Sequence, residues 1–94
     1  MGAKKLDDDQ FTRISKAIAD PNRFEVLQRI ATAEEAPTCS CVREWLGVAP
    51  ATVSHHLKEL ESAGLVSLER DGKYVRISLR RDTWKAYLNR LSSL

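Results

Sequence analysis

Two cysteines and two histidines are the side chains of this sequence best suited to nucleophilic, metal-binding or acid–base chemistry. Cys39 and Cys41 flank a single serine, and His55 and His56 are adjacent in the chain. Thiolates react with oxidants and electrophiles, and imidazole can donate and accept hydrogen bonds. However, the sequence has no glycine-rich nucleotide-binding loop, and no set of His, Cys and carboxylate residues is spaced for a catalytic triad or a catalytic metal. We therefore expect a protein that is not an enzyme.

The two histidines lie in a segment whose pattern predicts a helix from Pro50 to about Gly64. Proline suits the first helical position, and glycine supplies a left-handed stop. The inward side would be formed by Val53, Leu57 and Leu60. His56 lies beside this side, so we expect it to be packed and hydrogen-bonded. The opposite side and its edge would carry groups that suit contact with base edges and phosphates, namely Ala51, Thr52, Ser54, His55 and Lys58.

A charged hairpin is expected after this helix. Apolar and polar residues alternate over about residues 66–69 and 75–79, which is the period of a strand. Asp71-Gly72 between the two runs is a strong signal for a two-residue turn. The tip would form a wing that grips the DNA backbone or minor groove through Arg70, Lys73 and Tyr74. Further basic residues are expected to extend this side, namely Arg76, Arg80 and Arg81.

The rest of the chain predicts four more helices. They span about residues 8–19, residues 21–34, residues 38–47 and a closing segment around residues 84–91. The helix over residues 38–47 and the helix from Pro50 are joined by a short turn, as in a helix-turn-helix. We therefore predict a mainly α fold with a β-hairpin wing, in the order α-α-α-α-β-β-α. The 94 residues would form a single winged helix-turn-helix domain over residues 1–94.

The net charge is only weakly basic, and it leaves a second function open. The chain has 15 Lys and Arg against 13 Asp and Glu, a formal net charge of +2, which permits nucleic-acid binding without requiring it. Three acidic residues lie near the proposed DNA-binding side, namely Glu59, Glu61 and Glu69. If they interrupted that side, the winged helix would serve protein contacts without DNA. If Lys58, Arg70 and Lys73 converged with Thr52 and His55, DNA binding would be favoured.

The first and last helices carry wide apolar faces, which predict a homodimer. A domain of four short helices and a hairpin cannot cover both faces. The candidate interface residues are Phe11, Ile14, Trp84, Leu88 and Leu91. These residues could also pack partly on their own core. Two-fold symmetry would place the two reading helices about one DNA turn, roughly 34 Å, apart on a near-palindromic duplex.

Several segments carry a resemblance to a known family. Ala19-Asp20-Pro21-Asn22-Arg23, the run from Leu46 to Leu60, Ala63-Gly64-Leu65-Val66 and Asp71-Gly72-Lys73 resemble the matching segments of the ArsR/SmtB family of bacterial repressors. The resemblance implies a homodimer joined through the first and last helices, which represses a promoter until an inducer binds. Ala49 departs from the serine that is frequent in the family, so the helix from Pro50 would lack a side-chain cap, a loss of about 1 kcal/mol.

The resemblance also raises the question of what the cysteines sense. Some family members bind arsenite or soft metals through thiolates in a Cys-x-Cys pattern on the third helix. Here Cys39 and Cys41 are shifted by one residue from that pattern, and no third cysteine follows. If Thr38 caps this helix, the helix dipole would lower the pKa of both thiols. A structural role, redox or adduct sensing, and soft-metal or metalloid binding therefore all stay open. The family's other metal site is not expected, because the last helix has Asp82 but no histidine.

The sequence also carries an expectation about location. No apolar run is long enough to span a bilayer, and Met1 to Lys5 lack the apolar stretch of a signal peptide. Two closely spaced cysteines are poor material for a disulfide scaffold. We expect a cytoplasmic protein.

Overall fold

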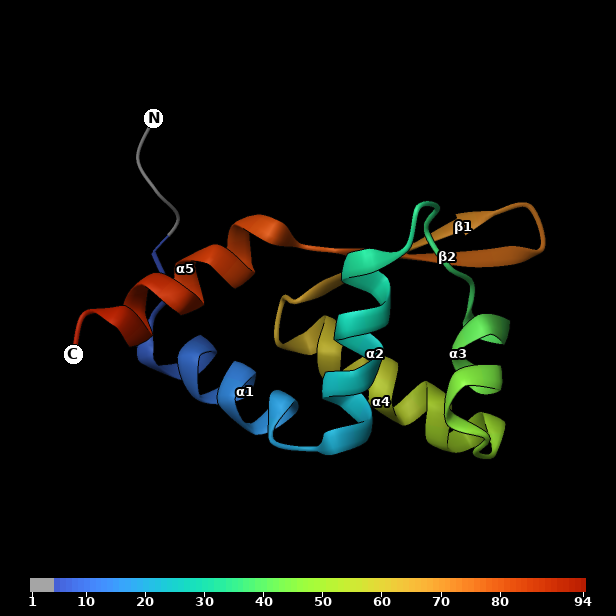
Figure 1. Cartoon of the computed structure of the whole chain (residues 1–94), viewed down its shortest axis with the longest axis horizontal. Helices are drawn as coiled ribbons and strands as arrows, with labels where there is room; N and C mark the ends of the chain where they lie inside the picture. Colours follow the sequence, from blue (N-terminus) through green and yellow to red (C-terminus); the bar gives the residue numbers. More distant parts are fainter. Residues whose placement is uncertain (1–4) are drawn as a thin grey trace.

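In the part of the chain that the structure describes, the fold consists of five helices and one antiparallel hairpin. The computed structural model describes residues 5–94, so Met1 to Lys4, which argued against a signal peptide, lie outside the described residues. The elements are α1 (Asp8–Ile18), α2 (Pro21–Thr32), α3 (Cys39–Leu46), α4 (Pro50–Ser62), β1 (Val66–Asp71), β2 (Tyr74–Leu79) and α5 (Arg81–Ser92). α1 and α5 lie together at one end of the molecule, and the hairpin and α3 lie at the other (Figure 1). The predicted order of elements is confirmed.

The helix starts follow local capping signals in the sequence. The side chain of Asp7 accepts the backbone N–H of Gln10 at 2.7 Å, and the side chain of Thr38 accepts that of Cys41 at 3.4 Å. Asp20 caps α2, with Pro21 in the first helical position. α4 begins at Pro50 with no side-chain cap hydrogen bond, as the alanine at position 49 predicted.

The hairpin turn lies one residue later than the sequence predicted. Asp71 pairs with Tyr74 across the hairpin, so the two loop residues are Gly72 and Lys73, not Asp71 and Gly72. Gly72 has a φ of 62°, whereas Lys73 keeps a negative φ. Two-residue hairpin turns of type II′ require glycine in the first loop position. This register pairs the two apolar residues Leu68 and Ile77.

The outer edge of β2 is covered by the segment that leads into α3. The backbone N–H of Ile77 donates to the carbonyl oxygen of Pro37 at 2.8 Å, and Thr38 forms an isolated bridge with Arg76. The start of α3 is therefore attached directly to the middle of β2. Among residues 5–94, no helix combines the length and hydrophobicity that a membrane crossing requires.

Candidate nucleic-acid interface

α3 and α4 form a helix-turn-helix whose second helix is anchored by its apolar side. α3 ends at Gly47, which adopts a left-handed conformation with a φ of 63°, and α4 begins three residues further along the chain. The inward side of α4 is almost fully buried, as predicted, with exposures of 2% for Val53, 3% for Leu57 and 0% for Leu60. Burying these side chains fixes which side of α4 faces solvent.

The polar side of α4 is fully available for a partner. Every residue predicted to read DNA from this helix is exposed, namely Ala51, Thr52, Ser54, His55 and Lys58. His56, by contrast, is 6% exposed, and its Nδ1 lies 3.3 Å from Nη1 of Arg23. The prediction that His56 is packed and hydrogen-bonded is therefore confirmed.

The glutamates of α4 lie toward its C-terminal end. The first turn of α4 contains no acidic residue, and Glu59 and Glu61 fall in its last turns. With about 100° of rotation per residue, Glu59 lies on the same side as His55, one turn further along α4, whereas Glu61 lies on the flank beyond Lys58. The N-terminal half of the polar side, which carries Thr52 and His55, is thus free of carboxylates. This arrangement favours DNA binding over the alternative of protein contacts alone.

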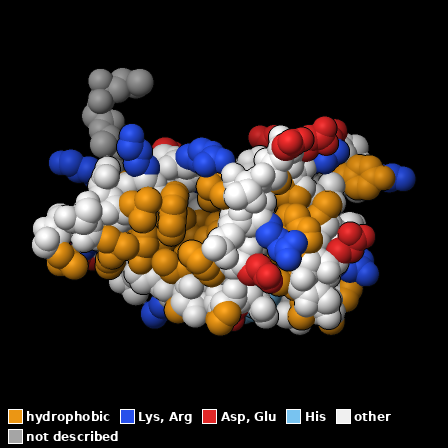
Figure 2. Space-filling model, in the orientation of Figure 1, with side chains coloured by type: hydrophobic (Ala, Val, Ile, Leu, Met, Phe, Trp, Pro, Cys, Tyr) orange, Lys and Arg blue, Asp and Glu red, His pale blue; other side chains and the backbone are white. Residues whose placement is uncertain are grey.

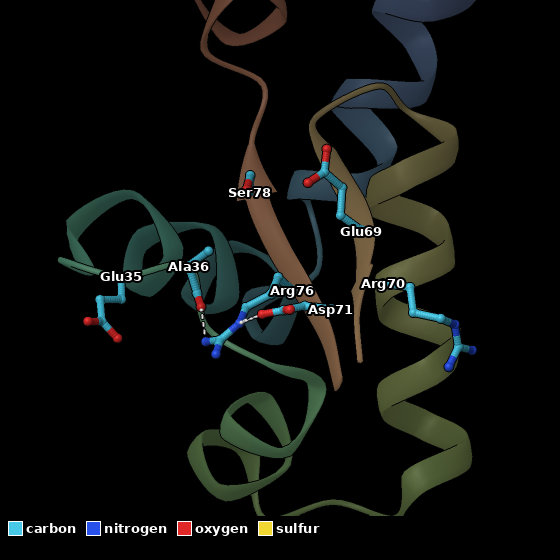
Figure 3. A pocket seen from close by; sticks show the side chains of 7 residues that line it. All are labelled: Glu35, Ala36, Glu69, Arg70, Asp71, Arg76 and Ser78. Atoms are coloured by element: carbon cyan, nitrogen blue, oxygen red, sulfur yellow. Dashed lines mark hydrogen bonds and ion pairs between the residues drawn. The ribbon is translucent and has the colours of Figure 1, made fainter. Parts of the chain in front are cut away.

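Arg70 and Glu69 of the wing lie on opposite faces of the hairpin, because successive residues of a strand alternate between its two faces. Arg70 pairs with Val75 and lies on the apolar face of the hairpin, whereas Glu69 pairs with Arg76 on the opposite face. In Figure 3 the side chain of Arg70 points toward α4, and Glu69 lies on the other side beside Ser78. Glu69 therefore does not interrupt the surface between Arg70 and α4.

The other two wing residues occupy the tip. Lys73 and Tyr74 are exposed, and Nζ of Lys73 lies 5.5 Å from the centre of the Tyr74 ring. Tyr74 follows the turn on the face opposite to Arg70. Arg70 and Tyr74 therefore could contact different parts of a duplex, which the linear sequence did not indicate.

Three arginines that were expected to extend the basic side make contacts within the protein. Arg76 lines an open hollow beside the wing, donates from Nη1 to the carbonyl oxygen of Ala36 at 2.9 Å, and pairs with Asp71 at 3.3 Å (Figure 3). Nε of Arg80 lies 3.5 Å from Oδ1 of Asp82. Nη2 of Arg81 donates to the carbonyl oxygen of Ala31 at 3.1 Å. These contacts brace the hairpin and the start of α5, while Arg80 and Arg81 stay exposed, so the extension of the basic side remains a prediction.

The candidate dimer face is apolar, but not all of its predicted residues reach the surface. Figure 2 shows hydrophobic side chains gathered over α1 and α5 and reaching α2. Leu88 is 44% and Leu91 40% exposed, and Phe11 and Trp84 are half-buried. Ile14 is 0% exposed. It packs entirely within its own protomer's core, so its prediction as an interface residue is wrong.

One apolar residue near this face was not among the predicted interface residues. Phe24 lies in the first turns of α2 and is 38% exposed. It lines a small apolar hollow together with Leu27, Gln28, Ala31, Leu79 and Trp84. Its helical spacing with Leu27 suggests a core residue, and only the position of α5 shows that its ring stays partly at the surface.

The two cysteines occupy different environments. Residues two positions apart on a helix point about 200° apart around its axis. Cys39 is half-buried and packs against the core, and this burial raises the pKa of its thiol. The hydroxyl of Thr38, 3.4 Å from Sγ of Cys41, lowers the pKa of the Cys41 thiol. The prediction of a lowered pKa therefore holds for Cys41 and is wrong for Cys39, where burial outweighs the effect of the helix start.

We predict that Cys41 reacts with iodoacetamide several-fold faster than Cys39 near neutral pH, because its lower pKa leaves more thiolate. The rate for Cys41 should also level off at a lower pH than the rate for Cys39. Alkylation of the Cys39→Ser and Cys41→Ser proteins, quenched at successive times, measures the reaction rate of the one thiol that remains in each. Equal rates in the folded proteins, with equal rates also in denaturant, would show that the local environments do not distinguish the thiols.

Comparisons with known proteins agree with this geometry. The profile of a family described as a helix-turn-helix domain matches residues 18–69. YceK of Bacillus subtilis, described as an uncharacterized HTH-type transcriptional regulator, is 32% identical over 88 residues, which cover 94% of this chain and 88% of YceK. A crystal structure of an ArsR-family transcriptional regulator superposes with a TM-score of 0.83 at 22% identity, covering 96% of this chain and 91% of the other. This chain belongs to the ArsR family. It is a DNA-binding transcriptional regulator with a winged helix-turn-helix fold, and the family does not consist of enzymes.

Two further relatives of this ArsR-family chain indicate what related proteins do. A probable mercury resistance operon repressor of Streptomyces lividans is 41% identical over 71 residues, which cover 76% of this chain and 55% of the repressor. This chain thus spans about half the length of that relative. A homodimeric winged helix-turn-helix DNA-binding domain from Mycobacterium bovis has a TM-score of 0.74 at 24% identity, covering 98% and 90% of the two chains.

Proposed function

We propose that this chain acts as a homodimeric, cytoplasmic repressor that reads a near-palindromic operator with α4 in the major groove. The observation that carries this proposal is the two-sided character of α4. Its apolar side is buried, while the side with Thr52, His55 and Lys58 is exposed and free of carboxylates in the first turn. The major groove admits an α-helix, hydroxyl and imidazole groups can hydrogen-bond to base edges, and an ammonium group pairs with phosphate.

The proposal of a homodimer rests on the exposed apolar face of α5. Leu88 and Leu91 lie three positions apart on one helix and are each at least 40% exposed. Two exposed leucines one helical turn apart, continuous with the apolar surface over α1 (Figure 2), suit a two-fold helix–helix contact. The Mycobacterium bovis relative is itself described as homodimeric.

The wing provides the test of DNA contact. Lys73→Ala should weaken binding to all duplexes to a similar extent and reduce the slope of log K against log salt by about one unit, because one phosphate contact is lost. Lys85→Ala is the matched control, since it removes the same exposed charge from α5, outside α4 and the wing. Salt titrations by fluorescence anisotropy measure both slopes. If the two variants share the wild-type slope, the wing does not contact phosphate.

We further propose that modification of the Cys41 thiol, by oxidation or by adduct formation, relieves repression. Cys41 has the thiol with the lowered pKa, and it lies at the start of α3, near the positive charge of Arg76 in the wing. A group added to Sγ would crowd the point where α3 is attached to β2 through Thr38 and Arg76. The attachment could then loosen and shift the wing relative to α4.

A soft metal or metalloid at Cys39 and Cys41 fits these residues less well. The two side chains diverge around the helix, and Cys39 packs against the core. Within residues 5–94, no group of three or more His, Cys, Asp or Glu side chains could hold a metal ion. A three-ligand site would thus need a group from a partner subunit or a small thiol.

The Cys41 proposal is tested by adding oxidant to the repressor bound to its operator. Release of the wild-type protein but not of Cys41→Ser would support the proposal. Release of Cys41→Ser as well would contradict it.

A further inference from the structure

Arg23 connects three helices through one side chain. It lies in the first turn of α2, where its backbone N–H donates to the capping carboxylate of Asp20 at 3.2 Å. Its Nε donates to the carbonyl oxygen of Ala17, near the end of α1, at 2.8 Å. Its Nη1 lies 3.3 Å from Nδ1 of His56 in α4. The guanidinium therefore spans from the end of α1 to the middle of the reading helix.

The chemistry of the two groups fixes the state of the histidine. A guanidinium group has only donors, so a hydrogen bond between these atoms requires Nδ1 of His56 to accept, with the ring proton on Nε2. His56 is 6% exposed, and hydrogen bonds are stronger in such surroundings than in water. The nearby carboxylate of Asp20 offsets the positive charge of Arg23. Arg23 and His56 thus form a specific contact with a defined tautomer.

The position of His56 gives this contact a consequence for DNA reading. His56 directly follows His55 and lies one helical turn after Thr52, both of which are exposed on the polar side of α4. The apolar residues Val53, Leu57 and Leu60 hold α4 against the core, but apolar packing is non-directional. A rotation of α4 by about 20° would move a side-chain tip at a radius of about 6 Å by roughly 2 Å. That displacement exceeds the tolerance of a hydrogen bond to a base.

We propose that Arg23 is a positioning residue for sequence reading, which acts through His56 to fix the rotation of α4. The proposal rests on the proposed function of α4 as the reading helix. Arg23 itself contacts no DNA in this account. Its loss therefore lowers the affinity for the operator while leaving the charge-driven affinity for random duplex nearly unchanged.

Four variants test this role by the ratio of operator affinity to random-duplex affinity. The operator is the duplex selected by the wild-type protein from a random pool. Arg23→Met and His56→Leu should each reduce the ratio about tenfold. That factor corresponds to the free energy of about one hydrogen bond to a charged group. The double variant should show nearly the same loss as either single variant, because both remove one interaction. His56→Asn should retain most of the ratio, since its side-chain oxygen can replace Nδ1 as acceptor.

The spectroscopic test does not depend on the variants folding. In the wild-type protein, ¹⁵N NMR of the imidazole ring should show His56 with an unprotonated Nδ1 and a protonated Nε2 at neutral pH. A protonated Nδ1 overturns the proposal. Equal losses on operator and random duplex, or additive losses in the double variant, also overturn it. A wild-type protein that selects no operator contradicts the proposed function itself, which separates that failure from a failure of the Arg23 proposal.

Discussion

Replacing Leu88 and Leu91 together by aspartate is expected to convert the dimer into a monomer and to weaken operator binding by about 100-fold or more. Two linked reading helices gain on the order of 10²- to 10⁴-fold in affinity over one, and the monomer loses this gain. Because both leucines are at least 40% exposed in the protomer, the fold of each chain should survive the change. Sedimentation equilibrium measures the assembly state, and titration of operator duplex measures the affinity.

The matched control for this prediction is Leu88→Met with Leu91→Met. Methionine keeps the apolar surface and adapts its shape, so this variant should remain dimeric and bind the operator nearly as well as the wild type. Circular dichroism should show the same helix content for the aspartate variant, the methionine variant and the wild type. An aspartate variant that is still dimeric would show that the two protomers meet elsewhere.

His55→Ala is expected to lower the affinity for the operator about tenfold or more while changing the affinity for random duplex little. His55 is exposed on the polar side of α4, and a contact to a base edge is worth about 1–3 kcal/mol of discrimination. Removing the imidazole therefore lowers the discrimination between operator and random duplex and leaves the phosphate contacts intact. Competition titrations with the two duplexes measure the ratio directly.

Glu59→Ala provides the control on the same helix. It removes an exposed carboxylate from the C-terminal half of α4, so it should raise the affinity for operator and random duplex by similar factors. The ratio of the two affinities should stay near the wild-type value. If His55→Ala instead weakens both duplexes equally, His55 contacts phosphate or supports folding, and it does not read a base.

The starts of α1, α2 and α3 could be predicted from the sequence because caps act locally, whereas α5, which has no side-chain cap, begins at Arg81, three residues before the predicted segment. Asp7, Asp20 and Thr38 each accept a backbone N–H within three residues, and Gly47 adopts the left-handed conformation that ends α3. The inward side of α4 could also be predicted, because periodic apolar residues define it within one helix. These features need no knowledge of tertiary packing.

The features that were missed depend on residues far apart in the chain. Arg76 contacts Ala36 across 40 positions, and Arg81 contacts Ala31 across 50, so their charge in the sequence did not reveal that they brace the fold. The same holds for Ile14, whose periodicity fits either a core or an interface until the neighbouring helices are placed. Arg23 and His56 were recognisable as residues of a helix start and a buried helix side, but not as partners. Tertiary placement alone brings them together.

The central claim is that this ArsR-family chain reads a two-fold DNA site as a dimer, and selection of bound duplexes from a random pool tests it most directly. We expect recovery of one near-palindromic sequence whose half-sites are centred about 34 Å apart, the spacing of one helical turn. Binding to it should weaken steeply with salt. Recovery of no common sequence, or of a single half-site without a symmetric partner, would contradict the account.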